Sequence, residues 1–386
     1  MEKQQKDIKN PEEYEIIPYS SEHLLQVARL MSPLWGDDIE LNLKHFKWKH
    51  IDNPYLEHPL AIVALHEGKV VGSRAYFALK FRVGERNDFI LLIPGDTVVH
   101  PKHQRKGLSV AMGKKAEEEY RSKYKVFLNF TSSPASLPGY LRLGFFPLAP
   151  KNLLTVFSKR KGLEDWMPTK AKNYLKKHKS RGFIQLLSRL RKILTSKKEM
   201  TLFGEFGNII ISDSPKPEDM VDVITKQNQK NQKIKLWQDE EFFQWRYLNP
   251  MGKYIFYYYR PDHSVTGYLV IRISPQNILR GHILDYAQSD NDTLEKILRY
   301  ITESGYPENL FIPSYGLEEN LLQTLKRLNL HERILTQKKK EHVSSEHQLL
   351  VRPIKENLVE NDWFIDGLDI RNFENWEIKP ICSDGD

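Results

Sequence analysis

The sequence predicts an α/β protein that uses one fold twice, each copy being a mixed, mostly antiparallel sheet flanked by helices. Three observations lead to this prediction. A short aromatic segment recurs in the second half of the chain, strand-like runs follow each copy, and a second segment recurs in the same order. The chain has 386 residues, a length that suggests two to three domains at about 150 residues per domain.

The recurring segments have two different offsets. Residues 46–51 (FKWKHI) reappear as residues 243–248 (FQWRYL), 197 positions later, and Asn-Pro follows each copy within a few residues. Residues 141–145 (LRLGF) parallel residues 326–330 (KRLNL), 185 positions later. Two matches in the same order indicate an internal duplication. The second copy is therefore shorter than the first between these anchors.

The residue patterns predict the elements in order. Apolar residues at helical spacing predict a helix over 21–34, and apolar or alternating runs between 60 and 99 predict a meander of strands. A helix over 108–121, a strand over 124–130 and a short helix over 138–143 follow. We expect the sheet to be antiparallel before the long helix and parallel after it. In the second half, strands are expected at 254–259 and 267–273.

Composition bounds the class of protein. With 40% hydrophobic and 11% aromatic residues, the chain can form sizeable cores. Cys382 is the single cysteine, which excludes an intrachain disulfide and a cysteine-rich zinc site. The amino-terminal stretch has no apolar signal region, and no apolar run approaches the length of a membrane span. We therefore expect a cytoplasmic protein.

The positive charge is concentrated in one segment. Net charge is +8, but residues 159–198 hold 14 Lys/Arg against Glu164 and Asp165, which leaves the rest of the chain mildly acidic. A DNA-binding domain needs a basic face of its own, so no DNA partner is expected. Residues 183–194 predict a basic amphipathic helix. It reads as a solvated connector, or as a weak contact with an anionic membrane or a partner.

An anion site is predicted where the strand ending at Val99 runs through a basic turn into a helix. Unpaired N–H groups and the macrodipole at a helix start can hold a pyrophosphate, and Gly107 lets a phosphate approach the backbone closely. Gln104, Arg105 and Lys106, which directly precede that glycine, add donors and charge.

These residues resemble the GNAT superfamily of coenzyme A-dependent N-acyltransferases. The family signature is Gln/Arg-x-x-Gly-x-Gly/Ala preceded by Val-x-Pro, and this chain reads Gln104-x-x-Gly107-x-Ser109 preceded by Val99-x-Pro. Ser109 departs mildly from the family's glycine or alanine. Residues 140–145 resemble the family's Tyr-x-x-x-Gly-Phe segment.

The resemblance implies a V-shaped opening between the fourth and fifth strands, where the pantetheine arm of acetyl-CoA lies. The backbone of Thr97, Val98 and Val99 would bond the pantetheine and polarise the thioester carbonyl. The pyrophosphate would be held by Gln104, Arg105, Lys106, Gly107, Leu108 and Ser109.

The resemblance also implies a general acid and a general base. Tyr140 would protonate the departing thiolate, a phenol of pKa about 10 beside a thiol of about 8.5; alternatively its ring packs on the sheet. Asp96 is the candidate base, with Glu67 and His100 as poorer ones, and it could equally be a turn residue. His100 and His103 lack a third ligand nearby, so no metal is expected.

The second copy lacks the phosphate turn. Residues 281–290 run into a helix without a basic glycine-containing loop, and Leu325 stands at the position of Tyr140. Asp290 and Asp292 would cap that helix and repel a pyrophosphate. We expect this copy to keep the fold without binding CoA, as a structural part or as one wall of the acceptor site.

These observations divide the chain into a catalytic domain, a basic amphipathic linker, a degenerate GNAT-like domain and a C-terminal tail, at 1–158, 159–200, 201–350 and 351–386. Acidic and aromatic residues of the tail could form an interaction segment, or a last strand packed at the chain end.

The predicted activity is acetyl-CoA-dependent N-acetyl transfer to a primary amine of a small molecule or amino sugar. Trp48, Trp245 and the aromatic strand at 254–259 could stack on sugar rings, or pack in the core. Two alternatives stay open: an aminoacyl-tRNA-dependent transferase of the tandem GNAT-like type, and a non-catalytic acyl-CoA-binding scaffold.

Overall fold

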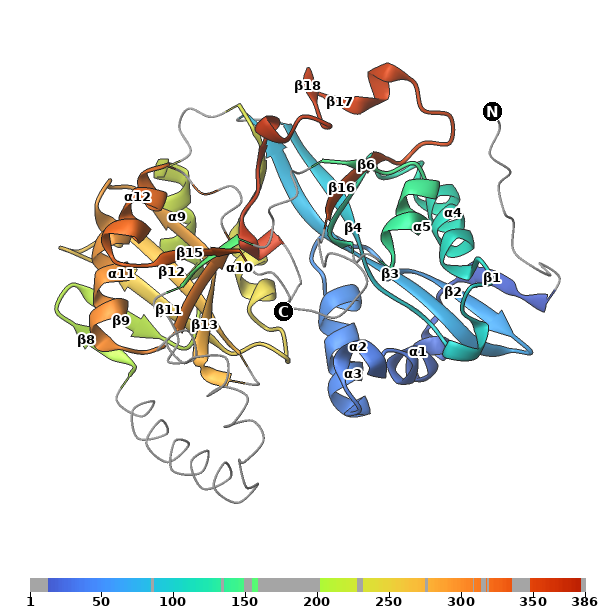
Figure 1. Cartoon of the computed structure of the whole chain (residues 1–386), viewed down its shortest axis with the longest axis horizontal. Helices are drawn as coiled ribbons and strands as arrows, with labels where there is room; N and C mark the ends of the chain where they lie inside the picture. Colours follow the sequence, from blue (N-terminus) through green and yellow to red (C-terminus); the bar gives the residue numbers. More distant parts are fainter. Residues whose placement is uncertain are drawn as a thin grey trace, which may run out of the picture. The chain divides into compact units, whose positions relative to one another are not determined.

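A computed structural model describes most of the chain (Figure 1). The described residues are 13–84, 87–132, 135–148, 155–158, 202–227, 232–274, 277–307, 309–313, 317, 319–334 and 348–382. The expected linker at 159–200 lies outside them. The chain forms two compact units: unit 1 draws on 1–154, 230–252 and 335–386, and unit 2 on 155–229 and 253–334.

The sheet of unit 1 has nine strands among the described residues. Seven follow the order β1-β2-β3-β4-β5-β16-β6, and β10 pairs with both β3 and β19. Neighbours are antiparallel except β4 with β5 and β10 with β19. The strands are β1 (Glu15–Pro18), β2 (Leu60–His66), β3 (Lys69–Val83), β4 (Asn87–Val99), β5 (Val126–Ser132), β6 (Phe146–Pro147), β10 (Ile234–Leu236), β16 (Gln348–Pro353) and β19 (Trp376–Glu377).

Helices cover both faces of this sheet (Figure 1). Alternate residues of β2 enter different cores: Leu60 and Ile62 pack with α4 and α5, whereas Ala61 and Val63 pack with α1 and α3. Because successive strand residues point to opposite faces, β2 reads as a continuous apolar run. The helices and turns are η2 (Ser21–His23), α1 (Leu24–Leu30), α2 (Ser32–Trp35), α3 (Ile39–Phe46), η3 (Lys47–Ile51), η4 (Pro101–His103), α4 (Leu108–Tyr120), α5 (Leu137–Arg142) and α10 (Glu240–Arg246).

Strands β4 and β5 separate along their length. They pair in parallel where Leu91 and Leu92 meet Val126 and Phe127. Beyond that point β4 continues along β3, and β5 pairs with β16. The result is the V-shaped opening expected between these strands, in a sheet that is mostly antiparallel as predicted.

Unit 2 contains a second mixed sheet, with eight strands among the described residues in the order β15-β7-β14-β13-β12-β11-β9-β8. Its strands β13 and β14 also pair in parallel over a short stretch. The elements are β7 (Thr155–Ser158), β8 (Gly204–Phe206), β9 (Ile209–Ser212), α9 (Pro217–Gln227), β11 (Tyr254–Tyr259), β12 (Gly267–Ser274), β13 (Asn277–Gln288), α11 (Thr293–Ser304), β14 (Asn309–Pro313), α12 (Glu319–Arg327) and β15 (His331–Ile334). Across the described parts of both units, no helix is long and apolar enough to cross a membrane.

Three described strands are exchanged between the halves of the chain: β7 lies in the sheet of unit 2, and β10 and β16 lie in the sheet of unit 1. β7 ends the first half in sequence, yet it lies between β14 and β15 of unit 2. β16 follows the second half, yet it lies between β5 and β6 of unit 1. The compact units therefore differ from the continuous segments 1–158 and 201–350 expected from the sequence. Each sheet is completed by a strand from the other half.

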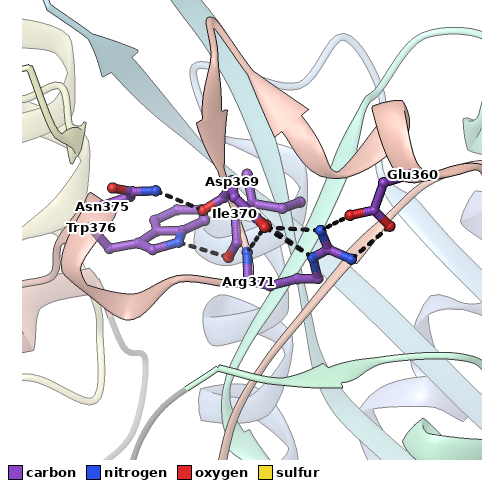
Figure 2. A network of polar contacts seen from close by, with 6 residues as sticks. All are labelled: Glu360, Asp369, Ile370, Arg371, Asn375 and Trp376. Carbon is purple, nitrogen blue, oxygen red and sulfur yellow. Dashed lines mark hydrogen bonds and ion pairs between the residues drawn. The ribbon is translucent and has the colours of Figure 1, made fainter.

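The C-terminal segment also belongs to unit 1. After β16 come η5 (Glu360–Trp363), the β17–β18 hairpin (Phe364–Ile365 and Leu368–Asp369), η6 (Phe373–Asn375), β19 and η7 (Pro380–Cys382). Figure 2 shows Arg371 bonded to both Glu360 and Asp369. Trp376 Nε1 donates to the Ile370 carbonyl at 2.9 Å. The described part of the tail therefore forms a short strand and packed turns, which is one of the two expectations.

Matching hydrogen bonds confirm the duplication. The Leu143 N–H donates to the Gly139 carbonyl at 3.1 Å, and Leu328 donates to Thr324 at 3.0 Å. The residues that follow are Gly144, with φ 81°, and Asn329, with φ 58°. Both copies therefore leave their helix through a left-handed residue, a conformation that glycine and asparagine adopt most readily.

Trp48 and Trp245, one from each copy of the recurring segment 46–51, face each other within unit 1. Trp48 Nε1 donates to the Trp245 carbonyl, and Trp245 Nε1 donates to the Trp48 carbonyl, both at 2.8 Å. Their rings stack with centroids 5.4 Å apart. The two indoles are buried in this reciprocal contact. They pack in the core, which is one of the two expected uses.

The first copy holds one more residue than the second between its Phe and its Asn. Seven positions separate Phe46 from Asn53, whereas six separate Phe243 from Asn249. The extra residue is taken up by η3, a single π-helical turn in which the Asp52 N–H donates to the Lys47 carbonyl at 2.8 Å. Such turns insert one residue without ending the helix, and they recur at functional sites.

Candidate active site

Asp96 lies at a bulge in β4, beside the V-shaped opening. Gly95 pairs with Ala75 and Thr97 pairs with Arg74, so Asp96 is the unpaired extra residue. Its φ of 45° is in the left-handed region. Aspartate tolerates this conformation better than most residues, and bulges re-aim side chains next to active sites.

The Asp96 carboxylate is held by three side chains. Lys49 Nζ lies 2.5 Å from Oδ2, His50 Nε2 lies 3.2 Å from the same oxygen, and Trp35 Nε1 donates to Oδ1 at 3.2 Å. The Asp96 side chain is 8% exposed. Burial by itself would raise its pKa, but the charge of Lys49 and the contact with His50 hold the pKa of Asp96 well below its usual range.

The π-turn η3 is what brings Lys49 and His50 to the bulge. His50 Nδ1 also lies 2.9 Å from the carbonyl oxygen of Tyr76 on β3. The second copy lacks the inserted residue and has arginine and tyrosine at the matching positions. The network is therefore particular to the first copy. The sequence prediction missed all three partners of Asp96, although the extra residue between Phe46 and Asn53 was a readable signal for Lys49 and His50.

The expected phosphate turn leads directly into α4. Gly107 is the residue before the helix, with φ 86° and ψ 0°. No side chain caps this helix start within the described part of the chain. Leu108 is buried and Ser109 is half-buried in the first turn. The start of α4 therefore keeps N–H groups and the positive end of the helix dipole for an anion.

The polar residues of this turn have partners of their own. Gln104 Nε2 donates to the Val99 carbonyl at 3.0 Å, which braces the turn against the end of β4. Lys106 Nζ donates to the Tyr14 hydroxyl at 2.8 Å. Arg105 is exposed, with φ 61°. Of the three, Arg105 is free to meet a phosphate as the structure stands, while Gln104 and Lys106 shape the turn.

Tyr140 lies on α5 with its side chain buried against the sheet. It is 6% exposed, and its ring meets Phe145 edge-on at 5.0 Å. The guanidinium carbon of Arg74 lies 4.7 Å from the ring centroid. Because Arg74 is the register partner of Thr97, this contact places Tyr140 beside β4 at the level of Thr97.

The expected acid and base therefore lie on different faces of the sheet. Asp96 meets residues of α2 and η3, whereas Tyr140 belongs to the core under α4 and α5. Thr97, Val98 and Val99 continue β4 between them toward the phosphate turn. The structure brings Tyr140 to Arg74, the register partner of Thr97, and it places the partners of Asp96 on the opposite face of the sheet.

The corresponding helix start in unit 2 is closed. Leu294 N–H donates to Gln288 Oε1 at 3.0 Å. Thr293 is 1% exposed, and its hydroxyl lies 3.1 Å from that of Thr266. Asp292 precedes the helix but makes no side-chain cap. The expected side-chain cap from Asp292 was wrong. Gln288 Oε1 accepts the hydrogen bond of the Leu294 N–H in its place.

Comparison with known proteins identifies a domain family for part of the chain. The acetyltransferase (GNAT) domain family matches residues 15–147. No curated protein matches the sequence.

Three solved structures share the fold. The GCN5-related N-acetyltransferase from Anabaena variabilis has a TM-score of 0.52 at 12% identity, covering 89% of this chain and 73% of that chain. The GCN5-related N-acetyltransferase from Kribbella flavida has a TM-score of 0.52 at 11% identity, with 88% and 71% covered. Eis1 from Mycobacterium abscessus has a TM-score of 0.50 at 13% identity, with 88% and 73% covered.

At these identities the likeness shows the fold. The family match spans β1 to β6 and so includes the bulge, the phosphate turn and α5. Residues 15–147 therefore match the GNAT acetyltransferase domain family, and the chain contains two mixed sheet bodies of the kind that tandem GNAT-like domains have.

Proposed function

We propose that this protein is an acetyl-CoA-dependent N-acetyltransferase that acts on a primary amine of a small molecule or amino sugar. The observation that carries the proposal is the uncapped start of α4 behind Gly107, set beside the opening between β4 and β5. A diphosphate and an extended arm are the two features of acetyl-CoA that such a turn and opening accommodate.

The turn fits a diphosphate by its backbone and by its charge. A glycine with φ 86° adds no side chain where the phosphate oxygens approach the N–H groups. Arg105 adds a cation, and Lys106 lies close by on Tyr14. The backbone of Thr97, Val98 and Val99 is proposed to bond the arm along the edge of β4 that β5 leaves unpaired.

Acetyl-CoA, when bound, supplies an activated acetyl group and a thiolate leaving group. Tyr140 is proposed to donate its phenolic proton to the departing sulfur. Its contact with Arg74 supports this role. Arg74 is the register partner of Thr97, which lies on the stretch of β4 proposed to hold the thioester.

The ion pair of Asp96 disfavours the expected role of this residue as a direct base. To accept a proton, the carboxylate would have to give up its contacts with Lys49 and His50. We propose instead that Asp96 locks the bulge, so that the β4 backbone on either side of it keeps its orientation toward the thioester. The amine then passes its proton to water on the acceptor face.

The tRNA-dependent alternative gains nothing from the phosphate turn, since an aminoacyl-tRNA donor carries no pyrophosphate arm. The scaffold alternative requires the same turn and predicts binding without turnover. The site therefore favours acyl-CoA as the donor, and turnover decides between enzyme and scaffold.

The test is calorimetric titration with acetyl-CoA, followed by a screen of amines for release of free CoA thiol. Gly107→Glu should abolish binding, since it places a carboxylate and a strained φ at the phosphate turn. Gly84→Glu is the matched control, because Gly84 also has positive φ (59°) but lies at the distant β3–β4 turn. Absence of binding by the unmodified protein, or equal loss in both variants, would refute the proposal.

A further inference from the structure

Arg74 is a fully buried cation beside the proposed general acid. It lies on β3 with 2% of its surface exposed, and its Nε donates to the Tyr76 hydroxyl at 2.7 Å. Its guanidinium carbon lies 4.7 Å from the ring centroid of Tyr140 and 5.6 Å from that of Tyr76. Two phenols from different elements therefore surround one guanidinium.

No carboxylate pairs with Arg74 in the described part of the chain. Its surroundings are aromatic: Tyr76 on its own strand, Tyr140 on α5 and, next to Tyr76, Tyr120 on α4. Arg352 of β16, whose charge acts on Tyr76, has its own carboxylate partner in Glu117 of α4 at 2.7 Å.

Burial of an unpaired charge opposes folding, so buried cations in proteins normally have a carboxylate or another anion as partner. A buried cation that lacks one, beside a reactive group, is a candidate functional residue. The anion that would complete this site is the phenolate that Tyr140 becomes once it has given up its proton.

We propose that Arg74 is a positioning residue that acts through Tyr140 and stabilises its phenolate during acetyl transfer. The inference rests on the proposed function. As the amine nitrogen bonds to the carbonyl carbon, the carbon–sulfur bond breaks and the sulfur takes the phenolic proton. The ammonium proton leaves to water, and the phenolate beside Arg74 later regains a proton from solvent.

The chemistry explains why a cation is useful at this point. A free phenol has a pKa of about 10 and a free thiol of about 8.5, so proton transfer from phenol to thiolate is unfavourable by roughly thirtyfold. A positive charge 4.7 Å from the centroid of the ring that carries the phenolate offsets part of this imbalance. Arg74 reaches the required position because it is the register partner of Thr97.

The experiment follows the ionisation of the Tyr140 phenol and needs no acceptor. The alkaline phenolate absorbance of each protein is recorded with and without Tyr140→Phe, and the difference isolates this one tyrosine. Arg74→Met should move its titration midpoint upward by roughly one to three pH units. Arg74→Lys should restore most of the original midpoint, because it returns the charge without the guanidinium fork.

If Arg74→Met does not fold, Arg74→Gln replaces it as the neutral variant. Arg74→Lys remains the control that keeps the positive charge. An unchanged midpoint in the neutral variants would overturn the inference. Calorimetry with acetyl-CoA separates this result from the proposed function: failure of binding by the unmodified protein refutes the function, whereas the phenol titration reports on Arg74 in either case.

Discussion

The starts of α4 and α11 occupy the same place in two copies of one fold, and they differ in what meets the first N–H groups. In α4, a left-handed glycine precedes the helix and no side chain caps it. In α11, Gln288 caps Leu294, and Thr293 fills the space beside Gly267. An added Cβ on Gly267 would lie 2.3 Å from Thr293. The helix start that is proposed to bind a phosphate in α4 is thus filled in α11 by two ordinary side chains without any change of fold.

The α5 region and its copy teach the same lesson. Tyr140 and Leu325 accept equivalent hydrogen bonds at the ends of their helices. The Phe145 N–H donates to the Tyr140 carbonyl at 3.1 Å, and the Leu330 N–H donates to the Leu325 carbonyl at 2.9 Å. The backbone is retained, but a phenol beside a cation has become an aliphatic core residue. The second copy therefore keeps the backbone conformation of the first but lacks the phenol that is proposed as the general acid.

The largest effect is expected from removing the exchanged strand β16. A chain ended after residue 347 lacks β16, which fills the place between β5 and β6 and carries the buried Arg352–Glu117 pair. We expect unit 1 to lose its cooperative unfolding transition and acetyl-CoA binding together. Circular dichroism during thermal unfolding checks this. Retention of a cooperative transition and of binding would show that β16 is dispensable.

The next largest effect concerns the general acid. Tyr140→Phe should lower turnover by roughly 10²- to 10⁴-fold and leave acetyl-CoA affinity nearly unchanged, since the lost group acts on the leaving thiolate. Release of free CoA thiol measures turnover, and calorimetry measures affinity. Leu325→Met, at the matching position in the second copy, should alter neither. A scaffold would show no effect of Tyr140→Phe on any rate.

The free energy of unfolding should depend on pH through His45, whose counterpart in the second half of the chain is Phe242. Burial, followed by the charge of Lys49, lowers the pKa of His45 to about 4 from an ordinary value near 6.5. Between these values the unfolded chain binds a proton that the folded chain does not. Stability therefore falls as pH falls from about 6.5 to about 4, by about 3 kcal/mol.

The second copy supplies the control for this prediction, because Phe242 stands 197 positions after His45. His45→Phe removes the titrating group while keeping an aromatic ring between Trp35 and Trp48. Urea unfolding at several pH values should give a flatter profile for the variant over this window. Parallel profiles for the two proteins would contradict the assignment.

The smallest effect is expected at the closed helix start. Gln288→Ala removes the cap on Leu294 and should destabilise the protein by about 1 kcal/mol. Because α11 is not proposed to meet acetyl-CoA, binding should be unaffected. Urea unfolding and calorimetry check both parts. A change in acetyl-CoA affinity would give the second copy a role in donor binding.

The sequence predicted what local patterns encode. The offsets of 197 and 185, the strand meander and the turn before α4 are all visible in short segments, and the structure contains them. The exchange of β7 and β16 has no local signal, since strands of both halves read alike and pairing is decided by distant residues. The network around Asp96 was hidden for a similar reason: Lys49 and His50 are 47 and 46 positions away.

Arg74 illustrates a different limit. An arginine within an apolar strand is ordinary in sequence, and its unusual character arises from its burial between Tyr76 and Tyr140. That enclosure requires the register of β3 on β4 and the placement of α5, neither of which the sequence pattern determines. Roles that depend on the absence of a partner charge become visible once the surroundings are known.

The position of β16 also sets the order in which the molecule can be made. A ribosome delivers β1 to β6 long before residue 348 emerges, so the first sheet must wait with β5 and β6 unjoined through the synthesis of the whole second half. Folding on the ribosome cannot then proceed one domain at a time. Because strands of each half complete the sheet of the other, we expect neither half of the chain to fold without the other.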